Sequence, residues 1–440
     1  MQLQYQPTQH PQRVQLHNEI HARPPEALQA PLAISHIVMV CDAAEREASR
    51  AHVQRLLRDH HLPQPDASCT HLRMEVGRFR IRWELHTEFV SWTFLMPARL
   101  DAFGEREPEC ASGVVPQDWL AALPGRCLSS LHLWAVPSTN LDAGVLVKQV
   151  LNEDTLVAST VADGFGEVYT DFAIHADGFS RIVLMVGGMT PRRLGRLVQR
   201  LLEIETYRMA ALLGLPAARE VSAVLASAER ELAALAQAIR TARREDEQQL
   251  LDRLTKLAGE VESQHAVTHS RLSASAAYFE LVDKRIRDIA ESRLPGMQTI
   301  RDFMDRRLTP ARSTCEWAAR RQDALSQRVS RISNLLRTRV EIEQEQSSQA
   351  LLKTMNQRQD MQIQLQSAVE GLSVAAITYY IVGLISYIAK AAQALGWPLS
   401  PETSAAVAVP FVALLMWWLL RRMHRRLRRS LALDAPPGDR

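Results

Sequence analysis

Two apolar stretches near the C-terminus decide the architecture: LSVAAITYYIVGLISYIA, from Leu372 to Ala389, and TSAAVAVPFVALLMWWLL, from Thr403 to Leu420. Neither contains a charged side chain. Each is about 18 residues long, close to the length that a tilted helix needs to cross about 30 Å of hydrocarbon. Because only a short connection separates them, we expect a hairpin of two transmembrane helices, 372–389 and 403–420, within a membrane region at 371–420.

The positive charge is uneven on the two sides of these stretches. The loop between them offers only Lys390, whereas the segment 421–440 is basic. By the positive-inside rule this tail lies in the cytoplasm, and a hairpin then places the N-terminal 370 residues there as well. The arginines at the end of the second stretch are Arg421, Arg422, Arg425, Arg426, Arg428 and Arg429.

The composition excludes several classes of partner. The net charge of +3 comes from the tail, and the rest of the chain sums to −2, so binding to nucleic acid is not expected. The tail is better matched to anionic lipid. The five cysteines have no CxxC spacing, which favours a reducing compartment without disulfides or a zinc site. The first residues lack the apolar core of a secretory signal.

Residues 1–214 are predicted to form a cytoplasmic domain of the α+β class, similar to α/β. From Ile34 to Val186, short segments alternate apolar and polar residues, which is typical of strands, and one helix is expected after the first strand. Two Ala-Asp-Gly-Phe repeats, at 162–165 and 176–179, predict hairpin turns. Asp163 and Asp177 then lie at opposite ends of the sheet and do not share a metal ion.

Residues 215–370 are predicted to form a helical coiled-coil stalk. Apolar residues follow heptad spacing from Val221 to Ile239, and a second register follows an interruption at 241–249. Such repeats require partner helices. We expect Pro295-Gly296 and Pro310 to break the helix before a last long helix runs into the first apolar stretch. The second register begins with Leu251, Leu254, Ala258 and Val261.

One face of this last helix is rich in glutamine before the membrane and in small or hydroxylated residues within it. Packing between helices is the simpler interpretation of such a face. A polar lining for a pore made by several copies is the alternative. No charge lies within either span, so a proton relay is not supported. The face consists of Gln359, Gln362, Gln366, Ser373, Tyr380, Gly383 and Tyr387.

The densest cluster of reactive side chains is the segment HNEIHARPPE at residues 17–26. Two histidines four residues apart can bind a metal ion on a helix. The order is HxExH rather than HExxH, however, and the two prolines favour an extended chain. We therefore expect a segment packed against the α+β domain and no metal, cofactor or catalytic site. Its residues are His17, Asn18, Glu19, His21, Arg23, Pro24 and Pro25.

Five motifs carry a family resemblance: LHNEIHARPPEAL (16–28), EFVSWTFL (88–95), FGEVYTDFAIHADGFSR (165–181), IETYRMAALLGLPAARE (204–220) and YYIVGLISYIAKA (379–391). In them the chain resembles a bacterial family of uncharacterised membrane-anchored proteins, domain of unknown function 3422. The resemblance covers nearly the whole chain. It implies an inner-membrane protein of Gram-negative bacteria without an assigned activity or functional residues.

The predicted architecture also resembles that of the CorA-type magnesium transporters, whose first span lines a pentameric pore and ends in Gly-Met-Asn. Here the corresponding end reads Tyr387-Ile388-Ala389-Lys390, with a lysine where a cation would enter. Both differences weigh against cation conduction in the manner of that family.

Three hypotheses about function follow. The first is an oligomeric structural or interaction protein of the inner membrane, held by lipid and by self-association of its helices. The second is a CorA-like channel or transporter without the usual filter. The third, an enzyme that uses the His17–Arg23 segment, ranks last because no catalytic signature is found.

Overall fold

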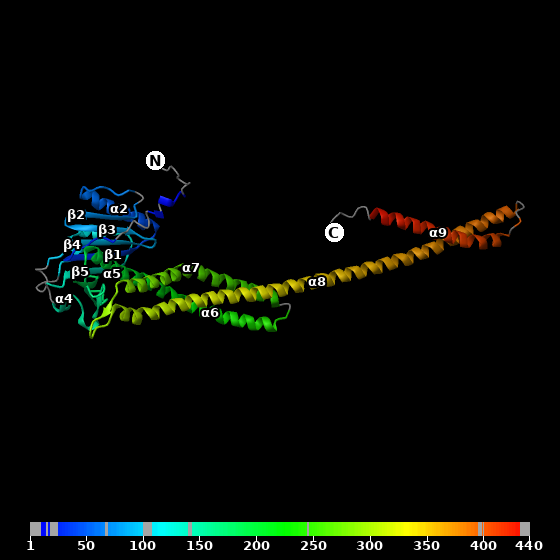
Figure 1. The fold of residues 1–440 in the computed structure, drawn as a ribbon. Helices are drawn as coiled ribbons and strands as arrows, with labels where there is room; N and C mark the ends of the chain where they lie inside the picture. The colour runs from blue at the N-terminus through cyan, green and yellow to red at the C-terminus, as the bar shows by residue number, and fades with distance from the viewer. Residues whose placement is uncertain are drawn as a thin grey trace, which may run out of the picture. The chain divides into compact units, whose positions relative to one another are not determined.

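The computed structural model describes residues 10–14, 16–17, 25–66, 69–99, 108–139, 143–243, 246–394, 398 and 400–431 (Figure 1). By its internal contacts the chain divides into two compact units, Met1–Leu336 and Arg337–Arg440. Helix α8 (Ile300–Ala394) contributes residues to both. The boundary between the units therefore falls inside a continuous helix.

A mixed β-sheet forms the base of the first unit. Among the described residues its nine strands lie in the order β2-β3-β4-β1-β5-β8-β7-β6-β9, and only the pair β5–β8 is parallel. The predicted sheet domain is thus confirmed, with the antiparallel majority that defines the α+β class. The strands are β1 (Leu32–Val40), β2 (His71–Val76), β3 (Phe79–Leu85), β4 (Phe89–Pro97), β5 (Arg126–Pro137), β6 (Val157–Val161), β7 (Gly166–Thr170), β8 (Ser180–Val186) and β9 (Ser292–Arg293).

Short helices cover one face of the sheet and close its main hydrophobic core. They are α2 (Ala43–Asp59), the 3₁₀ helix η2 (Ala111–Val114), α3 (Gln117–Ala121) and α4 (Ala143–Val150). Helix α2 begins with a capping box, in which the Asp42 carboxylate accepts from the Glu45 amide at 2.8 Å. Trp92 is fully buried and packs edge-on against Trp119, with 5.5 Å between ring centroids. Large aromatic residues thus supply much of the buried area.

Helix α5 (Pro191–Leu212) covers the other face. It begins after Thr190 with a proline at its first position, where the missing amide proton costs nothing. Its apolar stripe, including Leu194, Leu197 and Leu201, is buried. The segment after residue 25 crosses the start of this helix at Gly195, where an added Cβ would lie 1.6 Å from the Glu26 carbonyl oxygen. Only glycine permits this crossing.

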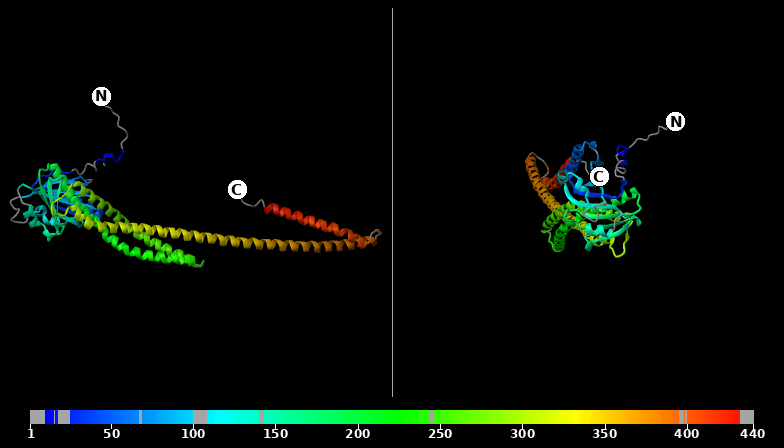
Figure 2. Two further views of the ribbon diagram at one scale, coloured as in Figure 1. Left: turned by 60° about the horizontal axis from the view of Figure 1, so that its bottom comes forward. Right: turned by 90° about the vertical axis from the view of Figure 1, so that its left-hand side faces the viewer.

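Helices α6 (Gly214–Thr241) and α7 (Glu247–Asp288) pack with α8 up to Leu336 (Figures 1 and 2). The first predicted register is confirmed, because Val221, Leu225 and Leu232 are buried. The second is confirmed in part. Leu254 and Val261 are buried as predicted, but Leu250 and Leu257 are buried in place of the half-buried Leu251 and Ala258. The packing of α7 against α5 and α6, and not the heptad alone, determines which of its residues are buried.

The expected break at Pro310 is also wrong, because α8 continues through this proline. Proline removes one helical hydrogen bond and crowds the preceding turn. On both sides of it, however, Leu308, Ala311 and Cys315 are buried, and this packing outweighs the local preference. The break at Pro295-Gly296 is confirmed, since Gly296 has a φ of +77° in the turn before α8.

The start of α8 is fixed to the edge of the sheet through Glu291. This carboxylate accepts from the amides of Ile300 (3.1 Å) and Arg301 (2.9 Å), which have no acceptor within the helix; the Ile300 amide also lies 3.3 Å from the Ser159 hydroxyl oxygen. The Ser159 hydroxyl of β6 donates to it at 2.9 Å. The Glu291 side chain, just before β9, therefore joins strand β6 to the N-terminus of α8.

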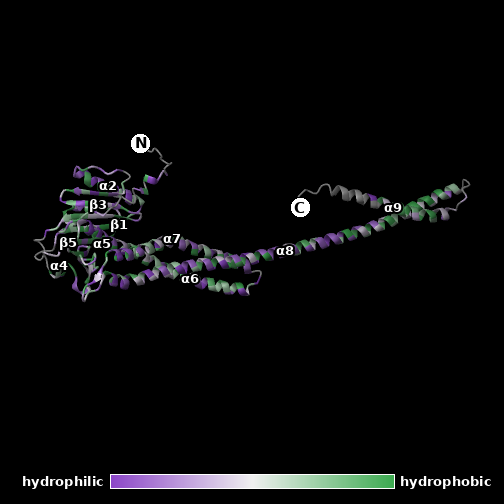
Figure 3. Cartoon of the chain, in the orientation of Figure 1, coloured by the Kyte–Doolittle hydropathy of each residue, from purple (hydrophilic) through white to green (hydrophobic). Residues whose placement is uncertain are grey.

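The second unit contains the rest of α8 and helix α9 (Pro401–Leu431). Both are long and apolar enough to cross a membrane, and their apolar residues form the green bands in Figure 3. From Arg337 onward no described residue is buried. A third stretch of sufficient length and apolar character, Pro191–Thr241, belongs to α5 and α6. Its apolar face is buried in the first unit, so it is a core segment.

Candidate functional site

The residues singled out in the N-terminal segment are only partly described. His17 and Pro25 are exposed, whereas Asn18, Glu19, His21, Arg23 and Pro24 lie outside the described residues. The last residue of the segment, Glu26, forms an ion pair with Arg80 of β3. Among the described residues no group of three or more His, Cys, Asp or Glu side chains is arranged to hold a metal ion.

The polar face predicted on the last helix lies on α8 in the second unit. Gln359, Gln362, Gln366, Ser373, Tyr380 and Tyr387 are exposed, and Gly383 is half-exposed. The Gln366 amide donates to Glu370 at 3.2 Å, and the Ser373 hydroxyl donates to the Val369 carbonyl at 2.9 Å. These are contacts within one helix. The choice between helix packing and a pore lining remains a prediction.

A buried polar network that sequence reasoning missed lies between the sheet and α5. His36 of β1 is its centre: Nδ1 lies 2.8 Å from the Thr93 hydroxyl of β4, and Nε2 lies 3.1 Å from the Thr206 hydroxyl of α5. The Thr206 hydroxyl donates to the Leu202 carbonyl, so its oxygen accepts from Nε2. Nδ1 then accepts from Thr93. These contacts assign the neutral Nε2–H tautomer.

Burial, assisted by the positive charge of Arg82, lowers the pKa of His36 to about 3. The ring is therefore neutral throughout the physiological range. Its two hydrogen bonds tie β1, β4 and α5 together without a charge. The cavity beside it has a volume of about 30 Å³, which is room for a single water molecule. This network can hold the helix on the sheet but offers no space for a substrate.

A row of polar side chains, two of them arginines, extends the network across the outer strands. Arg73, Arg82, Thr93 and His36 are cross-strand neighbours on β2, β3, β4 and β1. Arg82 donates to Glu84 at 2.8 Å. Burial and the neighbouring Arg82 both lower the pKa of Arg73. The alternation of these charges with apolar residues in β3 was the available sequence signal, because a charge on the covered face of a strand requires a buried partner.

The same edge of the sheet is bonded to α7. Glu88, in the turn between β3 and β4, accepts from Arg271 at 3.0 Å and from the Tyr278 hydroxyl at 2.8 Å. Burial and the Glu88 carboxylate raise the pKa of Tyr278. On α5, Glu203 pairs with Arg285 of α7. The sheet and the helices of the first unit are thus joined by charged as well as apolar contacts.

A second polar cluster imitates a catalytic triad on the opposite face of the sheet. The Ser35 hydroxyl lies 2.9 Å from Nδ1 of His132, and Nε2 of that histidine lies 3.9 Å from Asp177. Ser35 and His132 are 0% and 2% exposed, and the imidazole stacks on Phe179. Burial lowers the pKa of His132 to about 4. An acyl substrate cannot reach this serine, so the cluster is a polar pairing within the core.

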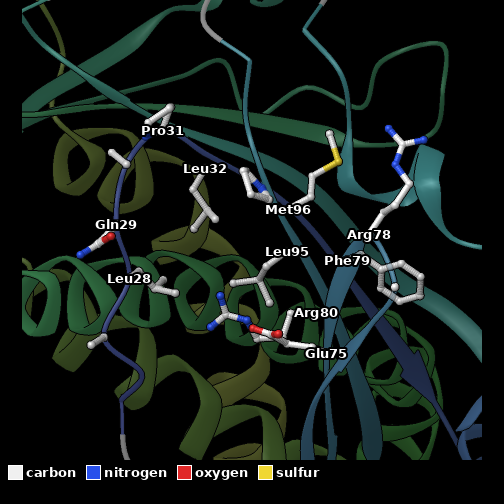
Figure 4. Close-up of a pocket in the computed structure, with 14 residues that line it drawn as sticks. Leu28, Gln29, Pro31, Leu32, Glu75, Arg78, Phe79, Arg80, Leu95 and Met96 are labelled. Carbon is white, nitrogen blue, oxygen red and sulfur yellow. The ribbon is translucent and has the colours of Figure 1, made fainter. Parts of the chain in front are cut away.

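A surface pocket of about 540 Å³ lies where the segment after Glu26 passes the turn between β2 and β3 (Figure 4). Its volume is within the range of small-molecule sites. Leu28, Leu32 and Leu95 form an apolar floor, and Glu75 and Arg80 point into it (Figure 4). Arg80 is already paired with Glu26. Glu75 and Arg78 remain in the lining as one anionic and one cationic side chain, so their charges together select neither an anion nor a cation.

The comparisons with known proteins give one result. The model of a family described as a protein of unknown function (DUF3422) matches residues 8–427. No curated protein and no solved structure matches the chain. The architectural likeness to CorA-type transporters therefore has no support from them.

Proposed function

Since the chain belongs to the family of proteins of unknown function DUF3422, and its second unit presents two uncovered apolar helices, we propose that it is a membrane-anchored, self-associating interaction protein. Its anchor is the pair of spans at 372–389 and 403–420. The sheet domain and the helices of the first unit lie on the cytoplasmic side of the bacterial inner membrane.

The exposure of the apolar side chains in the second unit carries this proposal. Tyr380 is 75% exposed and Phe411 is 71% exposed, and Leu384 and Leu414 are 62% exposed. Transfer of one such side chain out of water contributes about 1.5–3 kcal/mol. A contiguous surface of exposed apolar side chains marks a site that contacts a membrane or another protein. A lipid bilayer covers them without any change in the fold of either helix, because a helix pairs the backbone groups of its interior within the segment itself, apart from the bond missing at Pro410.

The orientation is supported by charge. Arg422 follows the second span and stacks on Trp418, with 5.0 Å from the guanidinium carbon to the ring centroid. Tryptophan and arginine together are typical of the cytoplasmic interface of a span. Lys390, at the other end of the hairpin, is the only cation that the loop offers.

Interaction is favoured over catalysis by the state of the buried polar groups. His36 and His132 are neutral and buried. Both ring nitrogens of His36 are hydrogen-bonded within the core, and Nδ1 of His132 pairs with the Ser35 hydroxyl. Neither can exchange a proton with a bound substrate at neutral pH. An enzyme that uses the His17–Arg23 segment is the weaker proposal, and unchanged ligand binding after His17→Ala and His21→Ala would remove it.

A CorA-like channel is the alternative within the same topology. It requires the face of Gln366, Ser373, Tyr380 and Gly383 to surround an aqueous axis. Cysteines at these four positions would then react with water-soluble thiol reagents in the assembled protein. Protection of all four positions would eliminate a pore.

The mass of the purified full chain tests the proposal. Light scattering in detergent, corrected for the bound detergent, should give a multiple of the 49.5 kDa subunit. A strict monomer at concentrations above the micromolar range would contradict self-association, while leaving the membrane anchor to be judged by extraction from vesicles.

A further inference from the structure

The part of α8 between residues 337 and 372 carries an apolar stripe along one side. Its members are all more than 60% exposed. Positions at spacings of three and four residues lie on one face of a helix. The stripe, called here the α8 seam, consists of Leu351, Met355, Leu365, Val369 and Leu372.

Over residues 351–372, the length of the seam, the opposite side of the helix is polar. Lys353, Asp360 and Ser367 lie about half a turn away from the seam and are exposed. An amphipathic helix of this kind buries its apolar side against another helix. We therefore expect the seam to be buried against another helix and the polar side to remain in contact with water.

No described part of the chain covers the seam, since all five of its residues are exposed. Helix α9 has 31 residues and so spans about 46 Å at 1.5 Å per residue. Folded back from the connection at 395–400, it reaches along α8 only to about residue 364. Leu351 and Met355 lie beyond that reach, and Leu365 and Val369 stay exposed beside its end.

We infer that the α8 seam is the contact between parallel copies of this chain, each held at the same height by its own membrane anchor. The inference rests on the proposed anchor, which forbids an antiparallel arrangement and prevents one copy from sliding past another. In this arrangement each apolar residue of the seam meets the same residue of its neighbour.

A polar layer inside the seam fixes the register. Arg358 and Gln362 occupy the seam positions between Met355 and Leu365. A polar layer in a helical seam reduces stability but disfavours shifted registers, because a shift would bury a polar side chain against an apolar one. Gln359 and Gln366 then lie beside the seam and not at its centre.

Disulfide cross-linking of the full chain in membrane vesicles tests the seam. The background replaces Cys69, Cys110 and Cys127, which are exposed or half-buried, by serine. Leu365→Cys is compared with Ser367→Cys, which lies two residues away on the polar side. Met355→Cys and Lys353→Cys form a second pair. All four positions are exposed, so the variants keep the fold.

Oxidation should give a species of twice the subunit mass, several-fold more abundant for Leu365→Cys and Met355→Cys than for their controls. Equal or reversed yields would overturn the seam, as would a product whose mass includes a different protein. If light scattering still shows an oligomer in that case, the proposed function stands and only the seam fails. A monomer would remove both.

Discussion

The two units of this chain differ in where their apolar side chains lie: those of the first unit form a buried core, whereas those of the second are exposed. In the first unit, Trp83 and Trp92 are completely buried by strands and helices of the same chain. In the second, Trp417 and Trp418 are about half exposed, and no described residue beyond Leu336 is buried. The first unit buries its apolar side chains in its own core. The second is completed by its surroundings, which we propose to be lipid and further copies of the chain.

The largest effect is expected from the core of the first unit. Trp92→Ala removes a fully buried ring that contacts His52, Trp83 and Trp119, and should lower its free energy of unfolding by about 3–5 kcal/mol. Urea unfolding followed by circular dichroism measures this. Trp418→Ala is the matched control in the second unit and should leave the same transition unchanged; equal losses would show that the two units share one core.

Acid should weaken the first unit through its neutral histidines. Burial lowers the pKa of His36 to about 3 and of His132 to about 4, below the unfolded value of 6.5. Below pH 6.5 the unfolded chain therefore binds protons that the folded chain does not. Each histidine then lowers the free energy of unfolding by about 1.4 kcal/mol for every pH unit between pH 6.5 and its folded pKa.

Unfolding measured at a series of pH values checks this, with the slope as the readout. His36→Gln should reduce the slope of the unfolding free energy against pH by the contribution of one histidine. His60→Gln, at an exposed position, should leave this slope unchanged. A slope that is the same in His36→Gln and in the unmodified chain would contradict the assignment of a neutral, enclosed ring.

A smaller loss is expected at the start of α8. Glu291→Ala removes the acceptor of the Arg301 amide and leaves the Ile300 amide with the longer contact to Ser159, which should lower the free energy of unfolding by about 1–2 kcal/mol. Thermal unfolding of the first unit measures the change. Gln366→Ala, which removes a contact within the exposed part of the same helix, is the control and should have no effect on this transition.

The smallest effect is expected for an ion pair near the surface. Arg321 of α8 donates to Glu229 of α6 at 2.8 Å, and the two side chains are 19% and 31% exposed. Such pairs contribute about 0.2–1 kcal/mol. A double-mutant cycle with Arg321→Gln and Glu229→Gln isolates the coupling. A coupling well above this range would mean that charge, and not apolar packing, holds α6 and α8 together.

Local patterns were sufficient to predict the elements that depend on neighbours in the chain. Alternation identified the strands of the sheet, and the two Ala-Asp-Gly-Phe repeats marked the turns before β7 and β8. The expected break at Pro310 and the position of Leu251 were wrong because packing between distant helices decides both. Periodicity shows that a helix has an apolar side. It does not show which of two adjacent apolar residues will be buried against the neighbouring helices.

The buried network around His36 could not be predicted from the sequence. Its partners, Thr93 and Thr206, lie 57 and 170 residues away, and no local motif links them. The motif at His17–Pro25 shows the reverse case. It stood out in the sequence, but most of its residues lie outside the described residues, so its role remains a prediction.

Alkaline carbonate extraction of vesicles tests the central contrast most directly. The full chain should stay in the membrane pellet, because two uncovered spans anchor it. A chain that ends at Leu336 should be found in the supernatant with its unfolding transition intact. Release of the full chain by carbonate, or loss of the cooperative transition in the shortened chain, would contradict the division into a self-contained first unit and a second unit completed by lipid.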